Sequence, residues 1–153
     1  MVFKIENEHM KERQCVKLVV YVFLLRHGKI LLGKRKNIFG YGHYSTPAGH
    51  MERGESVIEC AKRELFEETG LVADKFEFRC VRLIRPYKIN GEMADPYVAF
   101  CVEAKKWKNE PRNIEPNKNE GWGWHPLNKL PNPMFPPVKM LAECNKKSIP
   151  FID

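Results

Sequence analysis

The chain has 153 residues, of which 43% are hydrophobic, 11% aromatic and 29% charged. These proportions are typical of one folded domain and exclude a disordered chain, because enough apolar surface is present to bury a core. No apolar run approaches the roughly 20 residues of a membrane span, and the N-terminus lacks the hydrophobic stretch of a signal peptide. We therefore expect a single domain over residues 1–153, located in the cytoplasm and without a membrane partner.

The net charge is +7, from 26 basic and 19 acidic residues. This excess suits a polyanionic ligand but does not decide between a nucleic acid and a small phosphate ester. The five cysteines are widely spaced and form no CxxC pair, which argues against zinc and favours free thiols in a reducing compartment; they are Cys15, Cys60, Cys80, Cys101 and Cys144.

The first part of the chain predicts a strand hairpin and a loop. Residues 16–25 are β-branched and apolar, which predicts a buried strand. A turn that contains His27-Gly28 leads to a second strand over residues 30–33. A glycine-containing loop over residues 37–43 then precedes a further short strand over residues 44–48.

Residues 56–69 change to a helical pattern. Ile58, Ala61 and Leu65 recur at spacings of three and four and predict one buried stripe. Ser56 is a suitable N-terminal cap, and Gly70 a natural stop. Further along we expect strands over residues 75–87 and 97–104 joined through Asn90-Gly91, a short strand over 122–125 and a last helix over 138–146. This mixture predicts an α/β or α+β sandwich.

Three carboxylates crowd one face of the predicted helix. Glu64, Glu67 and Glu68 lie at i, i+3 and i+4, where like charges repel each other. A divalent cation is the simplest compensation, because Mg²⁺ prefers a few carboxylate oxygens together with substrate phosphates. The neighbouring Arg63 is suited to orient one carboxylate through a paired contact. Taken alone, the cluster is better explained by a solvated acidic face than by a metal site.

The whole segment is far more specific. Residues 49–71 read GHMERGESVIECAKRELFEETGL and fit the pattern G-x5-E-x7-R-E-U-x-E-E-x-G-U, with U aliphatic, at every fixed position. A chance match in this length is on the order of one in a million or less. This pattern is the Nudix box, so the chain resembles the Nudix hydrolases. The resemblance implies an α/β/α sandwich with a mixed central sheet, in which the box forms a loop, a helix and a loop.

The segments around the box extend the resemblance. ILLGKRK before it and EPRNIEPNKNEGWGWHPLNKLPNPMF after it are similar to MutT-like nucleoside triphosphate diphosphatases of the human and plant cytosolic type, over residues 17–142. This similarity implies Mg²⁺-dependent hydrolysis of a nucleoside triphosphate to monophosphate and pyrophosphate, with Mn²⁺ as a substitute metal. Homodimers are common in this subgroup. The chemistry demands a cation because a phosphoanhydride repels nucleophiles through its own negative charge.

The resemblance also assigns roles to single positions. It makes Glu67 and Glu68 ligands of Mg²⁺, and Glu64 a ligand or a base towards the attacking water. Further metal contacts are implied for the Ala48 carbonyl and for Glu120. The remaining assignments are Arg63 for orienting the carboxylates, Arg35, Lys34, Gly49 and Phe135 for substrate binding, and Gly49, Glu55 and Gly70 for the structure of the box. Relatives usually read PGG where this chain has Pro47-Ala48-Gly49, and alanine keeps the carbonyl.

Two other functions remain open. The same box serves enzymes that act on other nucleoside diphosphate derivatives, such as NADH, ADP-ribose or an RNA cap. A non-catalytic Nudix module that binds nucleotides or RNA through a basic surface is the alternative of another class. Such modules typically lose glutamates of the box, and none is lost here. We therefore expect a nucleotide substrate and no stable binding of nucleic acid; the preferred base and the identity of the general base stay open.

Overall fold

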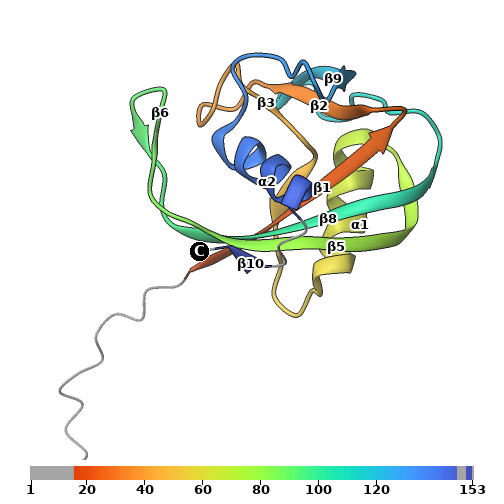
Figure 1. Cartoon of the computed structure of the whole chain (residues 1–153), viewed down its shortest axis with the longest axis horizontal. Helices are drawn as coiled ribbons and strands as arrows, with labels where there is room; N and C mark the ends of the chain where they lie inside the picture. Colours follow the sequence, from red (N-terminus) through yellow and green to blue (C-terminus); the bar gives the residue numbers. More distant parts are fainter. Residues whose placement is uncertain (1–15, 148–150, 153) are drawn as a thin grey trace, which may run out of the picture.

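The computed structural model describes residues 16–147 and 151–152, so the prediction for Cys15 lies outside it. Figure 1 shows helices α1 and α2 on opposite sides of a sheet built mainly from β1, β5 and β8. Within the described residues there are two helices and ten strands: β1 (Lys17–Arg26), β2 (Lys29–Arg35), β3 (Tyr44–Ser45), β4 (Ala48–His50), α1 (Val57–Thr69), β5 (Val72–Ile84), β6 (Lys88–Ile89), β7 (Glu92–Met93), β8 (Tyr97–Lys108), β9 (Asn119–Pro126), α2 (Pro136–Lys147) and β10 (Phe151–Ile152).

The sheet is mixed, as predicted. Strand β1 runs parallel to β8, and β10 runs parallel to β5, whereas the other pairings are antiparallel. The order across the sheet is β10-β5-β8-β1-β2-β3, with β4 also paired to β1 and β9 also paired to β2. The structure therefore confirms a sandwich with a mixed central sheet.

Strands β1 and β2 separate soon after the turn that joins them. They pair only at Leu25 with Ile30 and at Arg26 with Lys29. Positive φ angles at His27 and Gly28 form the tight turn between these pairs. Beyond them, β1 pairs with β4, and β2 pairs with β3 and β9. The two halves of the sheet thus diverge, and the functional residues described below lie where they part.

Alternation along β1 fills a core on each side of the sheet. Val20, Val22 and Leu24 pack towards α1, whereas Tyr21 and Phe23 lie in the cluster on the α2 side. Burial of each such aliphatic side chain contributes about 1.5–3 kcal/mol to folding. Because the strand is covered on both faces, its sequence shows a continuous apolar run and not an alternating one.

Several predicted boundaries and contacts differ from the structure. Ile58 is 38% exposed, and the buried face of α1 is formed by Cys60, Ala61, Leu65 and Thr69. The predicted strand over residues 44–48 is two strands, β3 and β4, because Pro47 lies between them and offers only a carbonyl, which accepts from the Val22 amide at 2.9 Å. The predicted link through Asn90-Gly91 is a small hairpin, β6–β7, with positive φ at both residues.

The predictions of free thiols and of no membrane span can be compared with the structure for the described residues. Cys60, Cys80, Cys101 and Cys144 are free and buried. None of the helices in residues 16–147 is long and apolar enough to span a membrane.

Helix α1 is fixed at both ends as predicted. The Ser56 hydroxyl accepts from the Glu59 amide at 3.2 Å, while the Glu59 carboxylate accepts from the Ser56 amide at 2.8 Å. This reciprocal pair is a capping box. Gly70 ends the helix in the left-handed conformation, with φ of 70°, and its amide donates to the Phe66 carbonyl.

We predict that Ser56→Ala lowers the free energy of unfolding by about 1 kcal/mol, because the cap acceptor is lost. For a domain of this size the melting temperature should fall by about 2–4 °C in thermal denaturation followed by circular dichroism. Ser56→Asp retains a side-chain oxygen and should melt close to the wild type. An equal loss in both variants would contradict the capping role.

Candidate active site

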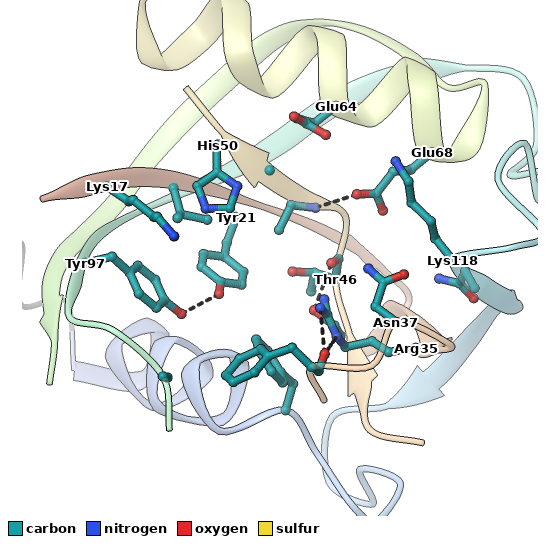
Figure 2. Close-up of a pocket in the computed structure, with 18 of the residues that line it drawn as sticks. Lys17, Tyr21, Arg35, Asn37, Thr46, His50, Glu64, Glu68, Tyr97 and Lys118 are labelled. Carbon is teal, nitrogen blue, oxygen red and sulfur yellow. Dashed lines mark hydrogen bonds between the residues drawn. The ribbon is translucent and has the colours of Figure 1, made fainter. Parts of the chain in front are cut away.

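A cavity of about 640 Å³ opens where β1 and β2 diverge. Its walls come from strands β1, β2, β3, β4, β7, β8 and β9, from α1, and from the segments after β2, before β6, between β7 and β8, before β9 and before α2. Figure 2 shows Glu64 and Glu68 pointing into it from α1, with Tyr21 and Tyr97 on another wall. The cavity therefore has an acidic end and an aromatic end.

Arg63 holds the Nudix-box loop against α1. Its Nε and Nη2 donate to the two oxygens of Glu55 at 2.8 and 2.9 Å, and Nη1 donates to Glu64 at 2.6 Å. Nη2 also donates to the His50 carbonyl at 3.0 Å. This pairing with Arg63 lowers the pKa of Glu55 to about 2, so Glu55 stays ionised and ties the loop to the helix.

Gly49 is required by the position of Glu64. A methyl group placed on Gly49 would lie 1.9 Å from the carboxyl carbon of Glu64. The carboxylate therefore lies directly against the backbone of β4, which only glycine permits. Burial raises the pKa of Glu64, although its bond to Arg63 acts in the opposite direction.

Glu68 is the carboxyl group of the site whose ionised form is least compensated. Its carboxylate accepts from the Ala48 amide at 3.3 Å, and none of the hydrogen bonds of Arg63 described above reaches it. Burial, together with the negative charges of Glu64 and Glu115, raises the pKa of Glu68 to about 8, although the hydrogen bond from the Ala48 amide acts in the opposite direction. A positive group brought between these carboxylates would be stabilised strongly.

Glu115 is the carboxylate that sequence reasoning missed. It lines the cavity from the loop before β9, and its charge acts on both Glu64 and Glu68. Backbone bonds anchor this loop to the end of α1, from the Ile114 amide to the Glu68 carbonyl at 3.3 Å and from the Arg112 amide to the Thr69 carbonyl at 2.9 Å. No spacing rule in the sequence distinguishes this loop carboxylate from its neighbours.

Three residues with a predicted metal or substrate contact, Lys34, Glu67 and Glu120, lie outside the cavity lining. Glu120 forms an ion pair with Lys34 at 3.2 Å, and neither side chain lines the cavity. Glu67 is 51% exposed and contacts Arg63 only at 3.4 Å. A turn of α1 brings Glu64 and Glu68 to the same side but leaves Glu67 rotated away from them.

The acidic end fits a divalent cation. Within residues 16–147, no three His, Cys, Asp or Glu side chains already surround one point at ligand distance. Mg²⁺ does not require such a cage, since it binds through one or two carboxylates and takes its other ligands from phosphates and water. Glu64 and Glu68 supply those carboxylates, with Glu115 near them; Arg63 compensates the charge of Glu64 only in part, and the pKa values of both groups are raised because burial disfavours their ionised forms.

The aromatic end is formed by Phe39, Tyr87 and Phe135. Their rings meet edge to face with centroids 6.0–6.3 Å apart. Arg35 lies over Phe135 with its guanidinium carbon 4.5 Å from the ring centre, and its Nη2 donates to the Phe39 carbonyl at 3.1 Å. Of the predicted substrate-binding residues, Arg35, Gly49 and Phe135 therefore line the cavity.

Comparisons with known proteins agree with this geometry. The NUDIX domain matches residues 16–148. The chain therefore belongs to the Nudix hydrolase family, which confirms the resemblance carried by the box. The crystal structure of a MutT NUDIX hydrolase from Burkholderia pseudomallei is similar, with a TM-score of 0.75 and 28% identity, over 85% of this chain and 98% of that one.

Relatives with related activities match parts of the chain. The oxidized purine nucleoside triphosphate hydrolase of Danio rerio is 39% identical over 93 residues, and that of Mus musculus is 40% identical over 58 residues. These matches span 60% and 37% of the relatives and 52% and 38% of this chain. An RNA pyrophosphohydrolase of Mesorhizobium japonicum is 26% identical over 87% of both chains.

We predict that Gly49→Ala lowers kcat at least about a hundredfold, because the added methyl group must displace the Glu64 carboxylate. Steady-state kinetics on any substrate of the wild type will measure this loss. Gly123→Ala is a matched control in β9, where the added methyl group meets only the His125 ring, 3.2 Å away at the closest atom. Equal kcat in the wild type and Gly49→Ala would show that the position of Glu64 is not needed.

Proposed function

We propose that the chain hydrolyses nucleoside triphosphates to a monophosphate and pyrophosphate with Mg²⁺ as cofactor. The observation that supports it is the polarity of the cavity, which joins the carboxyl groups of Glu64, Glu68 and Glu115 at one end to a cluster of aromatic rings at the other. A nucleotide has the matching polarity, with a metal-binding polyphosphate at one end and a planar base at the other. Removal of oxidised nucleotides is the use that the Danio rerio and Mus musculus relatives suggest.

In this proposal each residue has a physical task. Glu64 and Glu68 would hold the cation, with the Ala48 carbonyl as the further ligand that the resemblance implies, while Arg63 keeps Glu64 in place. The cation, when bound, neutralises phosphate charge and lowers the pKa of water. Arg35 lies at the boundary between the two ends, where it keeps Phe135 and the Phe39 loop in position beside the substrate.

A second substrate has one observation in its favour. The RNA pyrophosphohydrolase of Mesorhizobium japonicum matches a larger share of the chain than the two purine nucleotide hydrolases do. A triphosphate at an RNA 5′ end presents the same chemical group as a free nucleotide. NADH, ADP-ribose and capped RNA use the same phosphate chemistry and belong in the same comparison. The non-catalytic alternative gains no support from a cavity in which Glu64, Glu68 and Glu115 gather.

Further properties follow from the resemblance of the flanking segments. We propose Mn²⁺ as a substitute metal, a cytoplasmic location and a homodimer, with one domain over residues 1–153. Light scattering coupled to size-exclusion chromatography measures the oligomeric state directly.

The decisive experiment is a substrate panel with Mg²⁺. We expect pyrophosphate and a monophosphate from normal, oxidised or methylated nucleoside triphosphates, and no product after chelation of the metal. NADH, ADP-ribose, capped RNA and triphosphorylated RNA are compared by kcat/KM. If only NADH, ADP-ribose, capped RNA or triphosphorylated RNA is hydrolysed, the proposed substrate is wrong and the proposed mechanism stands. Folded protein that hydrolyses none of the compounds refutes the proposal.

We further propose that Glu115 performs the task that the resemblance assigned to Glu120. Glu115→Gln should lower kcat by about tenfold to a hundredfold, because one negative group beside the cation is lost while the shape is kept. Glu120→Gln should change kcat less than about threefold, because its carboxylate pairs with Lys34 away from the cavity. The reverse order of the two variants would restore the original assignment.

A further inference from the structure

Three buried thiols gather on the side of the sheet opposite the Nudix-box helix. Cys80 lies in β5, Cys101 in β8 and Cys144 in α2, and all three belong to the hydrophobic cluster that α2 covers. Each is free and at most 3% exposed. Cys80 lies within hydrogen-bonding reach of both other thiols. None of the three lines the cavity described above, so the proposed hydrolysis gives them no task.

A β-bulge brings Cys80 to this side of the sheet. The register between β5 and β8 shifts just before Cys80 pairs with Cys101, and Arg79 is left as an extra residue in β5. Phe76 packs on the α1 side, whereas Cys80 and Ile84 pack on the α2 side. An unbroken strand would keep these three even-numbered residues on one face. The bulge therefore places the Cys80 thiol on the same face as the Cys101 thiol and opposite it.

The pairing of Cys80 with Cys101 suits a disulfide. Residues directly opposite each other on antiparallel strands have Cα atoms about 4.5–5.5 Å apart. The Cα atoms of a disulfide are usually about 4.4–6.8 Å apart, so the bond fits this pair without a large movement of the backbone. Both side chains pack in the same cluster and so point to the same face.

Cys80 is the thiol of the three that ionises most readily. The hydrogen bond with Cys101 lowers the pKa of Cys80 by more than burial raises it. The hydrogen bond with Cys144 and the positive charges of Arg82 and Arg79 lower this pKa further. Burial raises the pKa of Cys101 and of Cys144. Because the thiolate is the reacting form, Cys80 is the better nucleophile towards an oxidant.

We propose that Cys80 and Cys101 form a reversible disulfide when the folded protein is exposed to hydrogen peroxide. The Cys80 sulfur attacks one peroxide oxygen and the O–O bond breaks; the departing hydroxide takes up the thiol proton and leaves as water. The Cys101 sulfur then attacks the Cys80 sulfenic acid, the S–O bond breaks, and a second water leaves with the Cys101 proton. The two thiols lose two electrons and two protons, and the peroxide is reduced to two waters.

The position of the pair makes this reaction local and reversible. Helix α2 packs against β5 and covers the sulfurs with Val138, Leu141 and Cys144 (Figure 1). Hydrogen peroxide is small, so a local opening of this one helix admits it while the rest of the fold stays intact. Disulfides in a reducing compartment are usually transient, and a dithiol restores both thiols by exchange.

The test uses the folded Cys15→Ser protein, treated with hydrogen peroxide. This substitution removes the cysteine that lies outside the described residues. Cleavage after lysine and arginine separates the other four, since Cys60, Cys80, Cys101 and Cys144 fall in fragments 54–62, 80–82, 89–105 and 140–146. The intact mass should fall by about 2 Da. A non-reduced digest should show fragment 80–82 linked to fragment 89–105, and dithiothreitol should restore both thiols.

Variants and an unfolded control sharpen the result. Cys101→Ala should abolish the loss of about 2 Da, because the partner of Cys80 is removed. Cys60→Ala is the matched control and should keep the yield of the disulfide within about twofold, since Cys60 lies on the α1 side of the sheet. The same oxidation in urea should give several pairings, including pairings with Cys60. Circular dichroism establishes that each variant is folded.

Three results would overturn the inference. One is that the thiols of the folded protein stay reduced under peroxide that oxidises the chain in urea. Another is a bond from Cys80 to Cys144 or Cys60 in place of Cys101. The third is a Cys80 that gains oxygen and forms no disulfide. Each of them leaves the proposed hydrolysis standing, because the substrate panel tests that activity separately.

Discussion

The guanidinium of Arg63 organises the acidic end of the cavity. It bonds the side chains of Glu55 and Glu64 and the backbone of His50, and so joins α1 to β4 and to the loop between them. Each of these bonds involves an ionised group or a carbonyl that would otherwise lie half-buried without a partner. Because one cation serves two carboxylates, the helix can carry several glutamates without the full repulsion that their spacing implies. The position of Glu64, and with it the need for glycine at position 49, follows from this arrangement.

None of the hydrogen bonds that Arg63 donates to Glu55, Glu64, Glu67 and His50 reaches Glu68. Its carboxylate is held by a long contact to the Ala48 amide and faces the charges of Glu64 and Glu115. A helix selected only for stability would place a neutral or apolar side chain there, because burying an unpaired charge is costly. Natural proteins depart from the rules of stable folding mainly at functional sites. The strain in this region is electrostatic, and a bound cation would relieve it.

The sequence predicts the parts of this structure that depend on short-range geometry. The spacing of Arg63, Glu64 and Glu68 on one helix is enough to bring them together, and Ser56 and Gly70 mark the ends of that helix. Helical spacing did not predict that Glu67 lies half-exposed and outside the cavity lining, because its position depends on how α1 is rotated against the sheet. The same limit explains Ile58, which has the correct period for a buried stripe but lies at its border.

Contacts between distant segments were beyond sequence reasoning. Tyr21 and Tyr97 are 76 residues apart and meet only because β1 lies beside β8. Glu115 and Glu120 occupy one polar loop and its following strand, and only the folded path decides which of them faces the cavity. The sequence assigned both Lys34 and Arg35 to substrate binding, but neighbouring residues of a strand point to opposite faces, and in the folded sheet Arg35 lines the cavity whereas Lys34 does not.

The divergence of β1 and β2 has a consequence for how such a protein can change over evolutionary time. The acidic end is carried by α1, the adjoining β4 and the loop that holds Glu115, whereas the rings of the other end come from segments around Phe39, Tyr87 and Phe135. Mutations that remodel one set need not disturb the other, because separate stretches of chain support them. Gene duplicates can therefore inherit a working reaction centre intact and acquire new substrates through drift in three short segments.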